Sequence, residues 1–201
     1  MHYAIQHQLQ SFEFLTTTPR KKVLKHSLIR VESGLVLLRL GKKEYAVEPG
    51  QSIWIPFDCL SSLSFFPQSV TQRIDFSCRL KALFPQNAGY VTESELSRAI
   101  FKRLADKKIE QAQLEHLLQV LKHEILAYDP KLTLSALSEH ITNWSPSQQG
   151  PIPKPFQLVL KVREARKRLL SGANQQSVIN DLFDGNKDDF TTLNTLILGT
   201  N

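Results

Sequence analysis

The sequence predicts an α+β protein, with a small β-barrel or β-sandwich in its N-terminal part and an all-α C-terminal region that contains one helix-turn-helix. Three observations predict this fold class. Short strand-like runs separated by turn residues fill residues 26–77, the apolar pattern changes to a helical period after Gly89, and the chain ends in a basic helix followed by two short helices. At 201 residues, the chain has room for one domain or two small ones.

Six short strands are expected in the N-terminal part. Gly34 and the sequence Pro49-Gly50-Gln51 are turn signals between apolar runs, and Pro56 ends the fourth run. Strands at this spacing are typical of a sandwich or a small barrel. The expected strands are residues 27–31, 35–40, 44–47, 52–55, 61–66 and 71–77.

Helices are expected after Gly89. Thr92 and Glu95 form a capping-box pattern, so a helix should begin at Thr92. A second helix over residues 108–128 carries an apolar stripe and ends at Asp129-Pro130. Residues 142–155 are rich in proline and serine and are expected to form a loop. The remaining helices are expected at residues 135–141, 156–171, 175–183 and 187–198.

The apolar stripe of the second helix has two interpretations. Its side chains can pack against the β half or the preceding helix within one chain. They can also form a two-helix seam between two copies, which predicts a homodimer. The stripe residues are Leu114, Leu118, Leu121 and Ile125. The sequence leaves both interpretations open.

The sequence excludes the common catalytic motifs. It contains no nucleophile elbow, phosphate-binding loop, dinucleotide fingerprint or zinc-protease helix. The β half offers only His26 as a histidine ligand for a metal, and we interpret it as structural. His116 and His123 are about 10 Å apart along one helix, too far to hold one ion together. We therefore expect no metal, no cofactor and no enzyme activity.

The two cysteines and the apolar content indicate a cytoplasmic protein. Cys59 and Cys78 form no Cys-x-x-Cys pattern and are expected to be buried, inert thiols in a reducing compartment. No apolar run reaches the ~20 residues of a membrane span, and the first residues lack a basic region followed by an apolar stretch. We expect no membrane partner.

Positive charge is concentrated near the C-terminus. The net charge is +6, and residues 151–172 contain six Lys or Arg residues against Glu164 alone. Arg163, Arg166 and Lys167 fall on one side of a helix, so they can contact phosphate groups together. The alternative interpretation is an ordinary solvated basic face.

The C-terminal part resembles the second half of the DNA-binding domain of AraC/XylS-type transcription regulators. The residues that carry this resemblance stand in the family's order, which is Phe156, Ala165, Leu169, Gly172, Val178, Leu182, Phe190 and Gly199-Thr200. The β half resembles the cupin-type sensor domain of such regulators, on Gly34, the Pro49-Gly50-Gln51 turn and Pro56. The resemblance divides the chain into a cupin-like sensor or dimerisation domain (residues 1–90), connecting helices (91–130) and a shortened helix-turn-helix domain (131–201).

This resemblance implies a sequence-specific DNA-binding transcription regulator. Double-stranded DNA would be the partner, and a small-molecule effector would bind in the β domain. The residues expected to contact DNA are Lys161, Arg163, Arg166, Lys167, Asn186, Lys187 and Thr191.

Several departures from the family pattern favour weaker DNA binding. The stretch between Pro130 and Phe156 is too short for the first of the family's two helix-turn-helix units. Phe183 stands where the turn glycine is usual, and Asn194 where an apolar residue is usual. Asp188 and Asp189 begin the presumed reading helix and oppose phosphate contacts. The alternative is a cupin-like small-molecule-binding or interaction protein with a degenerate tail. A third hypothesis, a cupin-like enzyme, is disfavoured because this sequence lacks the metal ligands.

Overall fold

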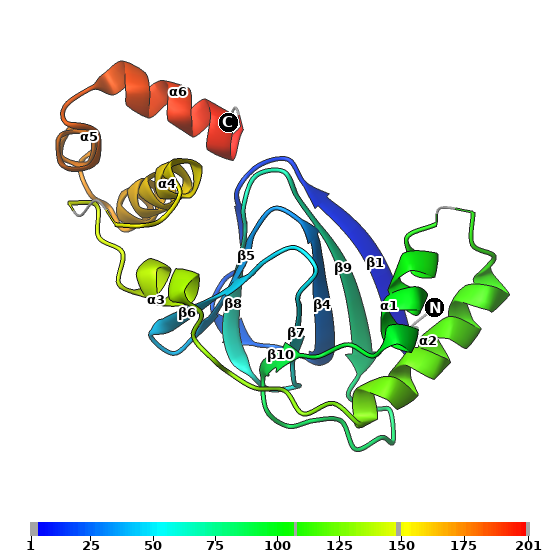
Figure 1. Ribbon diagram of the computed structural model, residues 1–201. Coiled ribbons are helices and arrows are strands. Elements are labelled where there is room, and N and C mark those ends of the chain that lie inside the picture. The colour runs from blue at the N-terminus through cyan, green and yellow to red at the C-terminus, as the bar shows by residue number, and fades with distance from the viewer. Residues whose placement is uncertain (1–3, 107, 148–149, 200–201) are drawn as a thin grey trace.

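The computed structural model describes residues 4–106, 108–147 and 150–199. Two antiparallel sheets face each other, one helix pair lies beside the first sheet, and the remaining helices lie beside the second (Figure 1). Sheet A has the strand order β1 (Ile5–Phe12), β9 (Ser69–Ser77), β4 (Lys25–Ser33), β7 (Ser52–Ile55) and β10 (Gly89–Val91). Sheet B has the order β2 (Thr16–Thr17), β8 (Leu60–Phe65), β5 (Val36–Leu40) and β6 (Lys43–Val47), and β3 (Lys21–Lys22) also pairs with β8.

The central strands of both sheets carry buried side chains on both faces. In sheet A, Ile29 points into the sandwich, whereas its neighbour Leu28 points outward to the helices. In sheet B, Leu38 points inward and Leu37 outward. Because successive strand side chains point to opposite faces, burial of both faces requires nearly continuous apolar runs. The interior is filled by side chains from both sheets, which are Ile29, Val31, Val36, Leu38, Tyr45, Val47, Ile53, Ile55, Leu63 and Phe65.

Two helices cover sheet A. α1 (Glu95–Leu104) and α2 (Gln111–Leu126) pack on its outer face, where Trp54 and Phe76 are fully buried. Ser94 caps α1 by accepting the N–H of Ser97, so the helix begins after Ser94 and the expected cap at Thr92 is wrong.

The apolar stripe of α2 packs within the chain. Leu118, Leu121 and Ile125 are buried in the same core as α1 and sheet A, and Leu114 is partly buried against it. The expectation of a homodimer through this stripe is therefore corrected, because these side chains already have intramolecular partners. His116 and His123 lie on the exposed side of α2.

The C-terminal helices cover sheet B. α3 (Ala136–Thr142) lies along β6, where the N–H of Ala46 donates to Ser138 Oγ at 3.0 Å. α4 (Lys154–Leu170), α5 (Gln175–Phe183) and α6 (Lys187–Leu198) form a three-helix group around a shared apolar core. Leu35, Leu37 and Ala46 of sheet B belong to that core. No helix in the described ranges has the length and apolar character of a membrane span.

Each of the six strands expected from the sequence overlaps a strand of the structure, and the α+β fold class is confirmed. Four strands were not expected, namely β1, β2, β3 and β10. The strands β2, β3 and β10 have only two or three residues each, and β1 is rich in glutamine and histidine.

Gly34 allows β4 and β9 to approach at the end of the sandwich. Its φ is +80°, and a Cβ built there would lie 2.4 Å from Ser69 Oγ and 2.6 Å from Ser69 Cα. Ser69 Oγ in turn bonds the N–H and the carbonyl oxygen of Leu35, both at 3.1 Å. A side chain at position 34 would break this arrangement.

We predict that Gly34→Ala lowers the free energy of unfolding more than Gly41→Ala does. Gly41 also has a positive φ, +61°, but a Cβ added there would meet no atom within 4 Å, so only backbone strain of about 1 kcal/mol applies. The clash with Ser69 should add about 1–3 kcal/mol at position 34. Equal losses for the two variants in chemical denaturation would contradict this account.

Candidate nucleic-acid interface

The α5–α6 pair is joined by a tight turn. Asp184 ends α5 in the left-handed conformation with φ 52°, and Gly185 follows with φ +79°. Asn186 caps α6, because its Oδ1 accepts the N–H groups of Asp188 and Asp189 at 3.0 and 3.1 Å. The positive φ angles of the turn therefore lie at Asp184 and Gly185. They come just after Phe183, which stands where the family usually has the turn glycine.

Phe183 has a packing role instead. Its ring lies edge-on to the ring of Phe190 with 5.2 Å between centroids, and both side chains are buried. This contact fixes the crossing of α5 and α6 at their junction. The first turn of α6, from Lys187 to Asp189, precedes Phe190 and is exposed to solvent.

The C-terminal end of α6 is hydrogen-bonded to the β half. The N–H of Leu15, in the loop between β1 and β2, donates to the carbonyl oxygen of Ile197 at 2.7 Å. Phe14 also lies against Gly199, where a Cβ would be 3.1 Å from its ring. Contacts near both ends of α6 therefore fix the position of its exposed first turn.

The sequence-predicted residues of the turn and α6 are exposed, but their polar atoms have local partners. Asn186 is occupied as the helix cap, and Thr191 Oγ1 donates to the carbonyl oxygen of Lys187 at 2.9 Å. The acidic pair Asp188 and Asp189 lies beside them in the first turn. The surface of this turn therefore combines one lysine with two carboxylates.

The predicted basic residues of α4 lie toward the β half. Arg163 donates to both carboxylate oxygens of Glu44 on β6, at 2.8 and 2.7 Å, in a half-buried ion pair. Lys167 pairs with Glu164 at 3.2 Å, and Arg166 is exposed. Lys161, the fourth predicted residue of this helix, is half-buried.

A cationic cleft lies between α4 and sheet B, with a volume of about 640 Å³. Arg163, Arg166 and Lys167 line it from α4, as the sequence predicts for one side of a helix. The β half contributes three more cations, and the carboxylates are Glu44 and Glu164 alone, so four positive charges are in excess. The three cations from the β half are Arg20, Arg39 and Lys42.

An effector was expected in the β domain, and the interior of the sandwich in that domain is occupied by side chains. The rings of Phe12 and Phe65 stack there with centroids 3.9 Å apart. The cleft beside α4 therefore offers more room for a ligand than the interior does. Its residues come from distant parts of the chain, and no periodic pattern in the sequence connects them.

His26 has the structural role that was expected from the sequence. It is 9% exposed, its Nδ1 accepts the N–H of Phe57 at 3.1 Å, and its ring stacks on Trp54. Burial lowers its pKa. Within the described residues, no group of three or more His, Cys, Asp or Glu side chains is placed to hold a metal ion.

The cysteines differ from the expectation that both are buried. Cys59 is half-buried, and burial raises the pKa of its thiol. Cys78 is exposed just after the last residue of β9, so its predicted burial is wrong.

Comparisons with known proteins show similarity at the level of fold. No protein-family model and no curated protein matches the sequence. The structure of ToxT from Vibrio cholerae is 9% identical with a TM-score of 0.41, and the match covers 96% of this chain and 94% of ToxT. Apo ToxT with a single substitution is 8% identical with a TM-score of 0.46, over 99% and 95% of the two chains.

Other similar structures match only a part of this chain, in its N-terminal region. A cupin-superfamily protein from Desulfitobacterium hafniense is 12% identical with a TM-score of 0.35, over 38% of this chain and 71% of that protein. Similarity at this level describes the path of the chain and carries no information on function.

We predict a strong coupling between Glu44 and Arg163 in a double-mutant cycle with Glu44→Gln and Arg163→Gln. A bidentate, half-buried pair should give a coupling free energy of about 1–3 kcal/mol. The exposed pair Lys22–Asp58, at 2.8 Å, is the matched control and should give at most about 1 kcal/mol. Equal coupling in the two cycles, measured by chemical denaturation, would show that Arg163 is not held by Glu44 in solution.

Asn194 provides a second test of the packing of α6. Its Oδ1 is buried without a hydrogen-bond partner in the described part of the chain. Asn194→Leu should raise the free energy of unfolding by about 1 kcal/mol, because the unpaired acceptor is removed. Asn180→Leu on the exposed side of α5 is the control and should give no gain. A loss of stability on Asn194→Leu would contradict this account of the packing.

Proposed function

We propose that this protein is a cytoplasmic, non-enzymatic transcription regulator of the AraC type that binds double-stranded DNA weakly. In this proposal, residues 131–201 contact DNA, residues 1–90 form the sensor part, and residues 91–130 connect them. The observation that carries the proposal is the exposed first turn of α6, set by a tight turn and supported by a cationic helix. In helix-turn-helix proteins, the start of the second helix contacts base edges in the major groove.

The arrangement of α6 supports this proposal. Phe190 and Ile197 anchor one face of the helix in the core, which leaves Lys187 and Thr191 on the exposed face. A single unit of this kind reads about half of the bases that two units read, so affinity and specificity should both be low.

Charge makes the binding weaker still. Asp188 and Asp189 repel phosphate groups at the point where the helix would enter the groove. Arg163, which was expected to contact phosphates, is held by Glu44. Arg166, Lys167 and Lys187 are then the exposed predicted cations that remain for the DNA backbone.

The cationic cleft favours a second function, the binding of a small anionic effector. Four excess positive charges in one cleft repel each other, and an anion between α4 and sheet B would offset that repulsion. Because Arg166 and Lys167 are shared by the cleft and the predicted DNA contacts, such an effector would compete with DNA. Without DNA binding, the same cleft supports the alternative of a small-molecule-binding protein with a degenerate tail.

We predict salt-dependent binding to a fluorescent duplex from the region upstream of the protein's own gene, measured by anisotropy over a salt series. Arg166→Gln should reduce the slope of log affinity against log salt by about 1, because one phosphate contact is lost. The double change Asp188→Asn with Asp189→Asn should strengthen binding, because it removes two repelling charges. Lys102→Gln, an exposed lysine on α1, is the matched control and should change neither quantity.

Two results would contradict this proposal. One is the absence of salt-dependent binding in both the natural protein and the Asp188→Asn, Asp189→Asn variant. The other is an equal loss of binding on Lys102→Gln and on Arg166→Gln, which would indicate attraction by net charge alone. Thermal stabilisation by an anion without any DNA binding would then favour the alternative function.

A further inference from the structure

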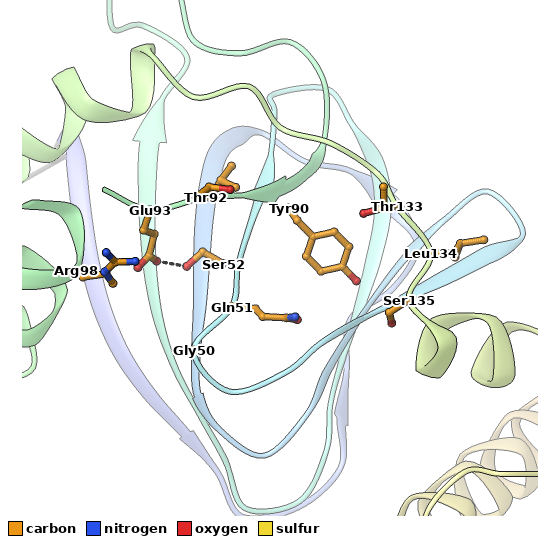
Figure 2. A pocket seen from close by; sticks show the side chains of 11 residues that line it. Gly50, Gln51, Ser52, Tyr90, Thr92, Glu93, Arg98, Thr133, Leu134 and Ser135 are labelled. Atoms are coloured by element: carbon orange, nitrogen blue, oxygen red, sulfur yellow. Dashed lines mark hydrogen bonds between the residues drawn. The ribbon is translucent and has the colours of Figure 1, made fainter. Parts of the chain in front are cut away.

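The molecule has a second cavity, of about 420 Å³, beside β10. Figure 2 shows the ring of Tyr90 between two groups of lining residues, with Glu93 and Arg98 on one side and residues 133–135 on the other. Glu93 is buried, and the guanidinium of Arg98 stands beside its carboxylate. The charge of Arg98 is therefore offset within the protein.

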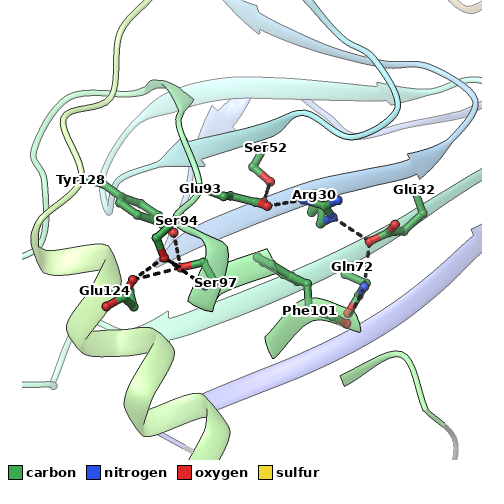
Figure 3. A network of polar contacts seen from close by, with 10 residues as sticks. All are labelled: Arg30, Glu32, Ser52, Gln72, Glu93, Ser94, Ser97, Phe101, Glu124 and Tyr128. Atoms are coloured by element: carbon green, nitrogen blue, oxygen red, sulfur yellow. Dashed lines mark hydrogen bonds and ion pairs between the residues drawn. The ribbon is translucent and has the colours of Figure 1, made fainter. Parts of the chain in front are cut away.

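The hydrogen-bond network behind this cavity uses its other charges (Figure 3). Glu93 accepts hydrogen bonds from Ser52 Oγ and from Arg30, and Arg30 also pairs with Glu32 at 3.0 Å. The two carboxylates share one paired arginine, so Arg98 supplies the second positive charge that offsets them. Among the described residues, this cavity therefore carries no excess of positive charge.

The cationic cleft between α4 and sheet B has the opposite character. Arg20, Arg39 and Lys42 line it from the β half and are exposed. None of the three forms an ion pair with a residue in the described ranges. Because like charges gathered in one cleft repel each other, this surface favours a partner with several negative charges.

Arg39 owes its lack of a partner to the contact that seats α4. Arg39 on β5 stands opposite Glu44 on β6, where a cross-strand ion pair would form in the sheet alone. Arg163 of α4 instead donates to both carboxylate oxygens of Glu44, at 2.8 and 2.7 Å. The ion pair that joins α4 to sheet B therefore leaves the guanidinium of Arg39 for a partner outside the chain.

The same side of the cleft carries hydroxyl groups. Ser62 and Ser64 of β8 lie on the outer face of sheet B, because Leu63 between them points into the sandwich. Thr17 and Thr18, at the end of β2, also line the cleft. Lys, Arg, Ser and Thr side chains are the common protein contacts to the phosphate oxygens of DNA. The composition of this face thus fits a phosphate backbone.

The opposite side of the cleft belongs to the predicted DNA contacts. Arg166 and Lys167 of α4 line it and are exposed. A DNA duplex carries one negative charge for about every 1.7 Å of its axis, so a backbone that reaches α4 presents further phosphates at the mouth of the cleft. Cations on both sides can then contact one stretch of backbone.

We propose that the β half itself binds DNA, with Arg20, Arg39 and Lys42 on phosphates next to those that Arg166 and Lys167 contact. This inference rests on the proposed function and extends it, because the sensor part becomes part of the DNA-binding surface. The added contacts replace some of those lost with the first helix-turn-helix unit. A duplex uses all five cations at once, whereas one small anion offsets only those that surround it.

The test is the salt series with the fluorescent duplex, applied to the double variant Arg39→Gln with Lys42→Gln. Two lost phosphate contacts should reduce the slope of log affinity against log salt by about 2. Lys81→Gln with Lys102→Gln is the matched control, because it removes the same charge from exposed lysines outside the cleft. The control should keep the natural slope, and both double variants should keep the natural melting temperature.

Neutral phosphate analogues locate the contacts on the DNA. Duplexes that carry a methylphosphonate at one position at a time should bind the natural protein more weakly where a phosphate is contacted. At least one of these positions should lose its effect in the Arg39→Gln, Lys42→Gln variant. Arg166→Gln should relieve a different, neighbouring position.

Three results would overturn this inference while the proposed function stands. In the first, the natural protein binds DNA with a steep salt dependence and the cleft double variant keeps the same slope. In the second, the matched control loses as much slope as the cleft variant. In the third, the cleft variant loses thermal stabilisation by pyrophosphate but keeps its DNA slope, which would assign the cleft to a small anion. Absence of DNA binding by the natural protein would overturn both proposals.

Discussion

The apolar contact between the outer face of sheet B and the C-terminal helices determines where the charged groups of the molecule point. Leu35, Leu37 and Ala46 supply one side of this contact, and Leu160 and Val162 of α4 belong to the same core. Burial of a leucine or valine side chain is worth about 1.5–3 kcal/mol. Once α4 is seated in this way, Arg163 is brought to Glu44, and Arg166 and Lys167 line the cleft while remaining exposed to solvent.

Under the proposed function, this seating would make DNA and sheet B compete for Arg163 of α4. A helix that tracks a DNA backbone presents its cations outward, whereas α4 presents Arg163 to its own sheet. The cost of separating that ion pair adds to the repulsion by Asp188 and Asp189. Under the proposed function, affinity for DNA would therefore depend on how firmly the helices are held to the β half, as well as on the composition of α6.

Local patterns in the sequence predicted most of the fold, and the failures have a common cause. The apolar runs identified six strands, because burial of both faces leaves a signal that does not depend on the partner strand. β1 gave no such signal: its Gln and His residues lie at a sheet edge, and its place depends on pairing with β9. The cap of α1 was predicted at Thr92 but lies at Ser94. Glu93, between them, accepts hydrogen bonds from Ser52 and Arg30, which belong to strands far away in the sequence.

The candidate sites show the same limit more strongly. The sequence placed Arg163, Arg166 and Lys167 on one side of a helix, which the cleft confirms, but it contained no sign that Glu44 would meet Arg163. Pairs that lie far apart in the chain leave no periodic pattern. The cavity beside Tyr90 was missed for this reason, since Arg98, Gln51 and Thr133 are brought together only by the completed sheet.

The hydrogen bond from Leu15 to Ile197 has a consequence for biosynthesis. It joins opposite ends of the chain, and contacts between such distant residues form late because the whole intervening loop must first be closed. A ribosome releases Leu15 long before it makes Ile197. The residues of the sandwich are therefore synthesised before α6, and a nascent chain stalled before the last turn of α6 would lack this hydrogen bond.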